Sequence, residues 1–352
     1  MWAWLAVPYA GCPVRHRGAG SRGPQGYRGR LRRRQLNCAL ANYQTELWRP
    51  AWSGKVCAGS GKLEEYAVSA IVGVHGIGKH KYYEEAGRSP EGAAEAMRLK
   101  WDRYLHAGLT GGSAHSGQSY ITTVAYYAHL LNDGPAGNAP MRAAAPQPMD
   151  QKAQAVLVEW AAQVDALKNA VGESLTGSLR RLTEWLLTRL DHRAAAFAGL
   201  FAPEVSAYLD GRQGARAACA SEVAETIRRE KARVVIAHSL GSVVAYEALW
   251  ANPDLEVDLL ITLGSPLGLR RVVFDRLTPA PVKGRGQRPK GVARWVNIAD
   301  KDDIAAIPPA LAALFGGVDL DIQVNLDWID FHTVEKYLGS GRLNPHLQPY
   351  LL

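Results

Sequence analysis

Short apolar runs that alternate with helix-forming segments constrain the fold of this chain most strongly. The clearest run covers residues 232–239, and the helix-forming segment LGSVVAYEALW follows it at once. Runs of the same kind cover residues 66–76, 258–266 and 292–300. Continuous Val, Ile and Leu are typical of strands that are buried on both faces of a parallel sheet. The alternation therefore predicts an α/β domain with a mostly parallel central sheet flanked by helices.

Capping and turn residues predict further elements between these runs. Residues 89–109 predict a helix, because Ser89 is a suitable N-cap, Pro90 lies in the first turn and Gly108 lies near the end. The remaining predicted elements are a strand over 119–131, a helix over 308–317 and a strand over 321–326.

A helical insertion is predicted at residues 149–230, before the strand at 232–239. Apolar residues recur there at steps of three and four and form two stripes. The stripes are Leu157, Trp160, Val164, Leu167 and Val171, and then Leu175, Leu179, Leu182 and Leu186. The insertion can pack beside the sheet, form a cap over a pocket, or do both.

The N-terminal segment, residues 1–66, differs in composition from the rest of the chain. Residues 1–45 hold eight Arg and no Asp or Glu. Without these eight, 33 of the 41 basic residues remain, and they balance the 33 acidic residues. The basic excess therefore belongs to this segment, which we expect to be a disordered extension or an upstream part of the reading frame outside the folded protein. Binding of anionic polymers and targeting are the other interpretations.

The expected location and cofactors of the protein follow from sequence signals that we do not find. The apolar start has no basic residue ahead of it, so it does not fit a secretory signal. No apolar run reaches the roughly 18 residues that span a bilayer. The four cysteines, at positions 12, 38, 57 and 219, show no paired spacing. We therefore expect a cytoplasmic protein with no transmembrane segment, no metal site and no cofactor, whose folded domain does not bind nucleic acid.

Ser239 is the candidate nucleophile. It lies in AHSLG, residues 237–241, between the apolar run and the following helix. Serine hydrolases place their nucleophile on such a strand-to-helix turn, in the pattern G-x-S-x-G. Ala237 replaces the first glycine, and one methyl group is tolerable there. A helix-capping serine is the alternative interpretation. We expect the neighbouring His238 to point away and to be structural.

A second serine turn, at Ser265 in LGSPLG, is a weaker candidate. The residue after a nucleophile donates its backbone N–H to the oxyanion, and Pro266 has none. We therefore expect this motif to form a turn at the edge of the site.

The stretch from Gly73 to His80 fits two motifs. Gly73–Lys79 matches G-x-x-x-x-G-K, but His80 stands where a phosphate-binding loop has Ser or Thr. The same letters contain H-G-x-G, the loop that supplies an oxyanion hole. We expect His75, Gly76 and Gly78 to support this loop, and the backbone N–H groups of Ile77 and Leu240 to form the hole.

A serine nucleophile needs a base and an orienting carboxylate, in the chain order Ser, acid, His. The histidines that follow Ser239 in the sequence are His332 and His346. His332 lies between the last predicted strand and a short helix, where a base on a loop is expected, and His346 is the alternative. Asp300, Asp302 and Asp303 compete for the role of the acid.

From residue 67 to residue 352 the chain resembles the lipase- and esterase-like α/β hydrolases, such as those of actinobacteria. The residues that carry this resemblance are VHGIG, AHSLG, ITLGSPL, WVNIADKDDIAAIP and FHTVEKYL. In similar families the fourth of these stretches reads W-x-N, then five further residues, then the acid. Trp295 and Asn297 then imply Asp303 as the acid, with Asp300 next. The resemblance does not cover the insertion.

The resemblance implies an α/β-hydrolase fold and a hydrolase that cleaves a carboxylic ester through Ser239, Asp303 and His332. The expected partner is a small acyl ester, with lipid-like esters among the candidates. Thioester or peptide cleavage by the same residues is one alternative, and a non-catalytic binding protein of the same fold is another. A surface binder that depends on the Arg-rich segment is a third. The sequence leaves the oligomeric state open.

Overall fold

The computed structural model describes residues 70–111, 121–132, 149–167, 192–211, 214–326 and 332–351. All of them belong to one of the two units into which the chain divides, Glu64–Leu352. The predicted N-terminal extension and the second stripe of the insertion, Leu175–Leu186, lie outside the described residues.

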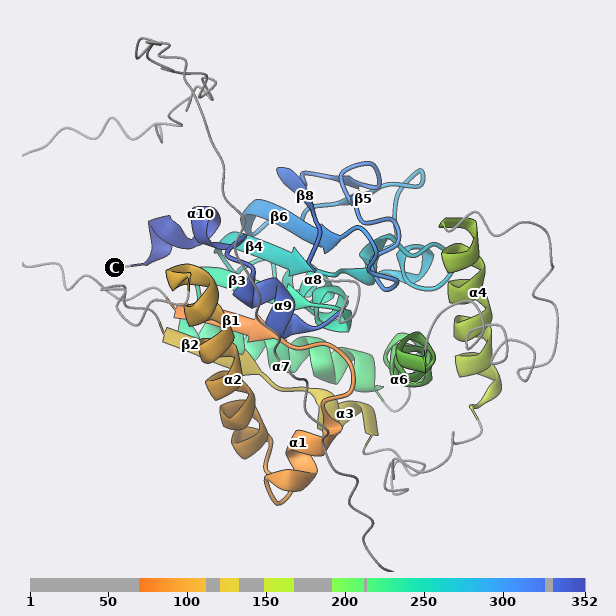
Figure 1. The fold of residues 1–352 in the computed structure, drawn as a ribbon, viewed down its shortest axis with the longest axis horizontal. Coiled ribbons are helices and arrows are strands. Elements are labelled where there is room, and N and C mark those ends of the chain that lie inside the picture. The colour runs from red at the N-terminus through yellow and green to blue at the C-terminus, as the bar shows by residue number, and fades with distance from the viewer. Residues whose placement is uncertain are drawn as a thin grey trace, which may run out of the picture. The chain divides into compact units, whose positions relative to one another are not determined.

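A six-stranded sheet lies at the centre of this unit (Figure 1). Its strand order is β2-β1-β3-β4-β6-β8, and each neighbouring pair is parallel. The predicted α/β class with a mostly parallel central sheet is therefore confirmed. Two short strands, β5 (Gly286–Gln287) and β7 (Phe315–Gly316), pair separately. The central strands are β1 (Ala70–Val74), β2 (Ile121–Ala125), β3 (Val234–His238), β4 (Val257–Leu263), β6 (Val292–Asp300) and β8 (Leu320–Val324).

Helices cover both faces of the sheet. Alternate strand residues point to opposite faces, as Val72 and Ile71 of β1 do, and each face has its own apolar core. On one face the core includes α7 (Ala215–Glu230) and α8 (Leu240–Ala251). On the other it includes α2 (Pro90–Thr110) and α9 (Val334–Gly339), which pack on each other. The described residues thus form three layers. The other helices are α1 (His80–Glu85), α3 (Ala128–Asn132), α4 (Gln151–Leu167), α6 (His192–Asp210), α10 (Asn344–Leu347) and the 3-10 turns η2 (Pro266–Gly268), η3 (Phe274–Arg276) and η4 (Gln348–Tyr350).

The described helices of the insertion have two different roles. Helix α7 packs against the sheet, next to α8. Helices α4 and α6 pack on each other, at the right of Figure 1. Leu157, Trp160 and Val164 of the predicted α4 stripe are all buried, and Trp160 Nε1 donates to the carbonyl of Ile304, 2.8 Å away, in the loop after β6. Helix α4 is thereby joined to the carboxyl edge of the sheet.

Two predicted elements are wrong in part. The strand predicted over 119–131 ends at Ala125, because the N–H of Tyr127 donates to His75 Nε2 instead of to a neighbouring strand. In place of the helix predicted over 308–317, the chain forms bends, turns and the short strand β7. Consecutive prolines disfavour helical conformations before them, and the Asp321 carboxylate accepts the N–H groups of the residues at 311 and 312.

The predicted helix over 89–109 is present as α2. The Ser89 hydroxyl accepts the N–H of Gly92 at 3.0 Å, as an N-cap does. Gly108 does not end the helix, which continues to Thr110 and is capped by Gly111. A Cβ on Gly108 would lie 2.0 Å from the carbonyl oxygen of Leu338. This glycine is therefore needed for the close packing of α2 on α9.

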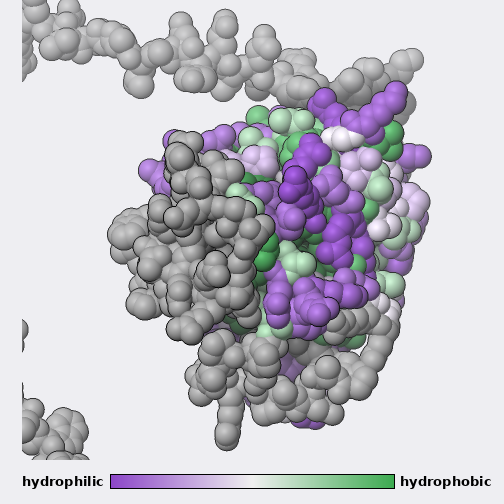
Figure 2. All heavy atoms as spheres, turned by 90° about the vertical axis from the view of Figure 1, so that its right-hand side faces the viewer, coloured by the Kyte–Doolittle hydropathy of each residue, from purple (hydrophilic) through white to green (hydrophobic). Residues whose placement is uncertain are grey.

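Figure 2 shows the described side chains on the side of α4. There the described side chains are mostly hydrophilic, with smaller hydrophobic areas between them. Large hydrophobic side chains in the described ranges are exposed only at scattered positions, Leu99, Val282 and Leu320. None of the described helices combines the length and the apolar character that crossing a membrane requires.

Candidate active site

Ser239 lies in the turn between β3 and α8, at the carboxyl edge of the sheet. Its φ of 56° and ψ of −133° belong to a region that few residues with side chains adopt. Backbone hydrogen bonds hold this turn: Ser239 N–H donates to Leu263 O at 3.0 Å, and Ser242 N–H donates to Ser239 O at 2.9 Å. The Ser242 hydroxyl also donates to Ser239 O, at 2.6 Å. The position of the Ser239 side chain is therefore fixed by the backbone.

His332 connects Ser239 to Asp303. Its Nε2 lies 2.7 Å from Ser239 Oγ, and its Nδ1 lies 2.9 and 2.8 Å from the two carboxylate oxygens of Asp303. The Asp303 carboxylate accepts a hydrogen bond from Nδ1–H, so Nε2 carries no proton and accepts the hydrogen bond of the serine O–H. The structure thus brings together the three side chains that the sequence analysis selected.

Asp303 lies in the loop after β6 and is almost completely buried, with 1% of its surface exposed. Besides His332, its carboxylate accepts the Tyr337 hydroxyl at 2.7 Å and the Ala305 N–H at 2.9 Å. Burial and the nearby Asp303 carboxylate raise the pKa of Tyr337 well above its ordinary value, so its hydroxyl remains a donor. A Cβ on Gly264, whose φ is +52°, would lie 2.6 Å from the same carboxylate. These contacts fix the orientation of the acid.

The competing residues lie elsewhere. The Asp300 carboxylate is buried and accepts two backbone N–H groups, from the residues at 302 and 326. Asp302 is exposed. His346 lies in α10, where its Nδ1 is 3.3 Å from a guanidinium nitrogen of Arg294. In the described part of the chain none of the three contacts Ser239 or His332.

Ser265 and Gly73, from the two motifs that the sequence disfavours as catalytic or phosphate-binding, have roles in holding the structure together. Ser265 Oγ pairs with Ser242 Oγ at 2.7 Å and accepts the N–H of Leu267 at 3.3 Å, so it holds the turn beside the site. Gly73, the first glycine of the phosphate-loop pattern, lies inside β1. A Cβ there would lie 2.6 Å from the ring of Trp101. This glycine therefore permits packing on α2 and is not part of a loop.

The loop after β1 is held by His75. His75 Nε2 accepts the Tyr127 N–H at 3.1 Å, so Nδ1 carries the proton and donates to Gly76 O at 2.8 Å. The Tyr127 hydroxyl donates to His75 O at 2.7 Å, and the two rings stack with centroids 4.1 Å apart. Burial lowers the pKa of His75 to about 3, so the ring is neutral. His75 therefore orients the loop and cannot serve as a charged group.

Helix α6 holds the far end of the same loop. The Glu204 carboxylate accepts the Gly78 N–H at 2.9 Å, and Gly78 has a φ of +72° that favours glycine. Burial raises the pKa of Glu204 to about 7. The Tyr126 hydroxyl donates to Lys79 O at 3.0 Å. The loop thus has fixed positions at both ends.

Glycines allow this loop to approach the serine turn closely. A Cβ on Gly76 would lie 2.5 Å from Ser239 Cβ and 3.0 Å from Ser239 Oγ. A Cβ on Gly241 would lie 2.3 Å from the carbonyl oxygen of His75. Both glycines are therefore required where the two segments meet.

Two backbone donors beside Ser239 are available to a ligand. The N–H groups of Ile77 and Leu240 have no hydrogen-bond acceptor among the residues that the structure describes. Leu240 is the first residue of α8, and the first N–H groups of a helix have no acceptor within it. These are the donors that the sequence analysis selected for an oxyanion.

The comparisons with known proteins give no relative for this chain. No protein-family model matches it, and no curated protein or solved structure does either.

The expectation that His238 points away from the site is wrong. It shares a sheet face with Val234 and Ile236, the face that α9 covers, and His332 lies just before α9. The rings of His238 and His332 are 4.8 Å apart. His238 Nε2 is buried without a hydrogen-bond partner in the described structure. Burial, followed by the neighbouring His332, lowers the pKa of His238 well below its ordinary value, so the ring is neutral.

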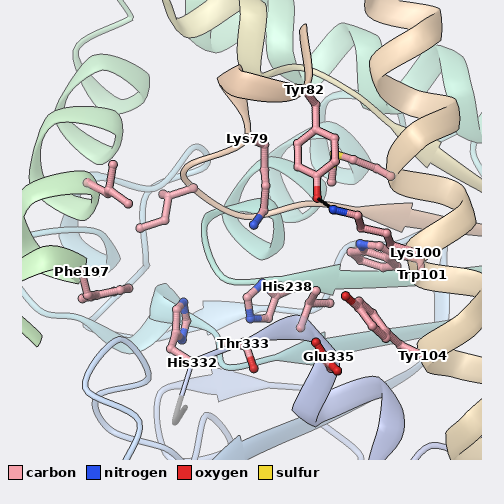
Figure 3. A pocket seen from close by; sticks show the side chains of 14 residues that line it. Lys79, Tyr82, Lys100, Trp101, Tyr104, Phe197, His238, His332, Thr333 and Glu335 are labelled. Carbon is pink, nitrogen blue, oxygen red and sulfur yellow. Dashed lines mark hydrogen bonds between the residues drawn. The ribbon is translucent and has the colours of Figure 1, made fainter. Parts of the chain in front are cut away.

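A cavity of about 280 Å³ lies beside His332 (Figure 3). Phe197 and Leu200 of α6 form one wall, so part of the insertion borders the pocket. Phe197 meets the His332 ring edge-on, with centroids 4.9 Å apart. The other described residues that line the cavity are Ile77, Lys79, Tyr82, Met97, Lys100, Trp101, Tyr104, His238, Thr333, Val334 and Glu335.

The supporting residues Tyr127, Glu204 and Tyr337 could not be selected from the sequence. Each acts through a contact with a residue far away in the chain. Tyr337 lies within FHTVEKYL, but nothing in that stretch of sequence indicates its contact with Asp303. The first lies in a segment predicted as a strand, and the second lies in the insertion. Within the described ranges no cluster of His, Cys, Asp and Glu could hold a metal ion.

Proposed function

We propose that this protein is a serine hydrolase with an α/β-hydrolase fold, which cleaves carboxylic esters through an acyl-enzyme. The observation that carries the proposal is His332, whose Nε2 lies 2.7 Å from Ser239 Oγ while its Nδ1 contacts Asp303. The strained strand-to-helix turn, the chain order Ser, Asp, His and the loop after an earlier strand support it.

In the first half of the reaction, Ser239 Oγ attacks the ester carbonyl carbon. His332 Nε2 takes the hydroxyl proton, and Asp303 stabilises the imidazolium that forms. The carbonyl oxygen becomes an oxyanion, which accepts hydrogen bonds from the backbone N–H groups of Ile77 and Leu240. Collapse of this intermediate breaks the bond to the alcohol, which leaves with the proton from His332.

In the second half, water clears the acyl group. His332 takes a proton from the water while the water oxygen attacks the acyl carbonyl carbon. The same two N–H groups donate hydrogen bonds to the second oxyanion. Collapse releases the carboxylic acid and returns the proton to Ser239 Oγ. Removing one donor from such an oxyanion hole costs on the order of 10²- to 10³-fold in rate. The fixed loop and turn supply both donors without rearrangement.

The expected reaction is tested by comparing two serine variants. Ser239→Ala should lower the kcat/KM for p-nitrophenyl butyrate by about 10⁴-fold or more, because the nucleophile is lost. Ser265→Ala is the matched control, since this serine also follows a strand, but in the described structure its hydroxyl forms hydrogen bonds only with Ser242 and Leu267. It should retain turnover. Equal activity of the Ser239→Ala and wild-type proteins would refute the proposal, and so would an inactive, folded wild type.

A substrate panel separates the alternative acyl chemistries. A thioesterase or a peptidase would use the same side chains, but would have its highest kcat/KM on a thioester or an anilide of the same acyl group. A binding protein would turn over none of them.

A further inference from the structure

Lys79 places a positive charge in the cavity beside the candidate catalytic residues. It directly follows the glycines of the loop after β1, and its carbonyl is held by the Tyr126 hydroxyl at 3.0 Å. Its side chain lines the cavity together with His238 and His332, and Figure 3 shows its amine directed into that space. The charge therefore lies in the same cavity as His332, whose Nε2 contacts Ser239 Oγ.

No protein group in the described structure pairs with this ammonium. It takes part in none of the hydrogen bonds or ion pairs among those residues. The carboxylate that attracts it most is that of Glu204, which accepts the Gly78 N–H and does not reach ion-pair distance from Lys79. Burial lowers the pKa of Lys79 from its ordinary value, which shows the cost of holding this charge in the cavity.

The rest of the cavity adds little negative charge. Lys100 lies at its exposed rim and donates to the Tyr82 hydroxyl at 2.8 Å. His238 is neutral and His332 faces Asp303. Glu335 is the acidic residue among the described lining residues, and it is exposed. Lys79 is half-buried. A partly desolvated cation without a partner is costly, and a ligand with the opposite charge lowers that cost.

We propose that the ester cleaved by this protein carries an anionic oxygen group, which pairs with Lys79 while the ester carbonyl lies at Ser239. This inference rests on the proposed function and names its substrate class. The anionic group can belong to the acyl part or to the alcohol part of the ester. An ammonium that binds a carboxylate makes a charge-assisted hydrogen bond, and such a bond contributes roughly tenfold or more to binding.

Two matched ester pairs test this specificity. The first pair places the charge in the acyl part, as mono-p-nitrophenyl adipate against its methyl ester. The second places it in the alcohol part, as p-acetoxybenzoate against its methyl ester. For each pair, the kcat/KM of the anionic ester is divided by that of the neutral ester. Because both esters meet the same protein preparation, a general loss of activity cancels in this ratio.

The ratio should depend on the charge at Lys79. In the wild type we expect at least one pair to show a ratio of about ten or more. Lys79→Gln should lower that ratio at least about fivefold, and Lys79→Arg, which keeps the charge, should retain more of it. Lys81→Gln is the control, because it removes an exposed charge two residues away that does not line the cavity. It should leave the ratio unchanged.

The outcomes distinguish this inference from the function on which it rests. If the neutral esters are cleaved but neither pair shows a preference, or if the preference survives in Lys79→Gln, the inference is wrong and the proposed function stands. If the wild type cleaves none of the four esters and Ser239 does not react with a fluorophosphonate, both are wrong.

Discussion

Replacing Gly76 with alanine tests how closely the loop after β1 approaches Ser239. The new Cβ would lie 2.5 Å from Ser239 Cβ, whereas ordinary contacts begin at 3.4 Å, so the overlap is about 0.9 Å. Gly76 is not among the residues with positive φ, so the substitution adds no backbone strain of that kind. Since Ser239 Cβ is fixed by the backbone of its turn, it cannot rotate away. The loop or the turn must move.

A displacement of this size has a predictable effect on catalysis. Moving a catalytic group by about 1 Å can lower the rate on the order of 10²-fold. We therefore expect Gly76→Ala to lower the kcat/KM for p-nitrophenyl butyrate by about a hundredfold in a protein that still folds. The assay pairs steady-state kinetics with thermal melting and with active-site titration by a fluorophosphonate.

Gly199→Ala is the matched control for this experiment. Gly199 lies in α6, and a Cβ there would meet no atom within 4 Å. This variant should keep wild-type activity, and alanine at a helix interior should stabilise the protein by about 0.5–1 kcal/mol. A folded Gly76→Ala protein with activity within about twofold of wild type would show that the loop does not constrain the serine as described.

Two further predictions concern the supporting residues. Tyr337→Phe removes a donor to Asp303 and the acceptor of the Asp300 N–H, both of them buried, so the free energy of unfolding in urea should fall by about 2–3 kcal/mol; an unchanged unfolding midpoint would contradict this. Glu204 has a folded-state pKa of about 7, above its ordinary 4.5, so the folded chain keeps a proton that the unfolded chain releases. This group therefore destabilises the fold increasingly as the pH rises from 4.5 to about 7, by at most about 3 kcal/mol, and its effect is constant above that range. The glutamine in Glu204→Gln cannot ionise and can still accept a hydrogen bond from the Gly78 N–H. The difference in unfolding free energy between this variant and the wild type should therefore increase, in favour of the variant, from about pH 5 to pH 8. Parallel pH profiles for the two proteins would contradict the burial of this carboxylate.

Most of the sheet could be predicted because β1, β3, β4 and most of β6 are buried on both faces. The runs at 66–76 and 232–239 contain β1 and β3, and their apolar residues need no long-range information. The turns and the short strand β7 over 308–317 could not be predicted, because two prolines and the Asp321 carboxylate outweigh the helix preference of the Ala and Leu residues there. Gly108 lies near the end of α2 as expected, but its packing against α9 is not encoded locally.

Some residues of the candidate site could be predicted from the sequence, and others only from the structure. Ser239 lies in a local motif. His332 could be selected because the chain has few histidines after Ser239. The position of His238 depends on which face of β3 is covered by α9, which a sequence does not reveal. Lys79 is part of a recognisable motif, yet its significance depends on the absence of a described partner, which only the packed structure can show.

The most direct test of the central claim is the mass of the protein after reaction with a fluorophosphonate, followed by peptide mapping. A serine is reactive only if an imidazole and an oxyanion hole activate it, so the account predicts one adduct per chain, located on Ser239. Unmodified, correctly folded protein, or an adduct on a different residue, would contradict the account.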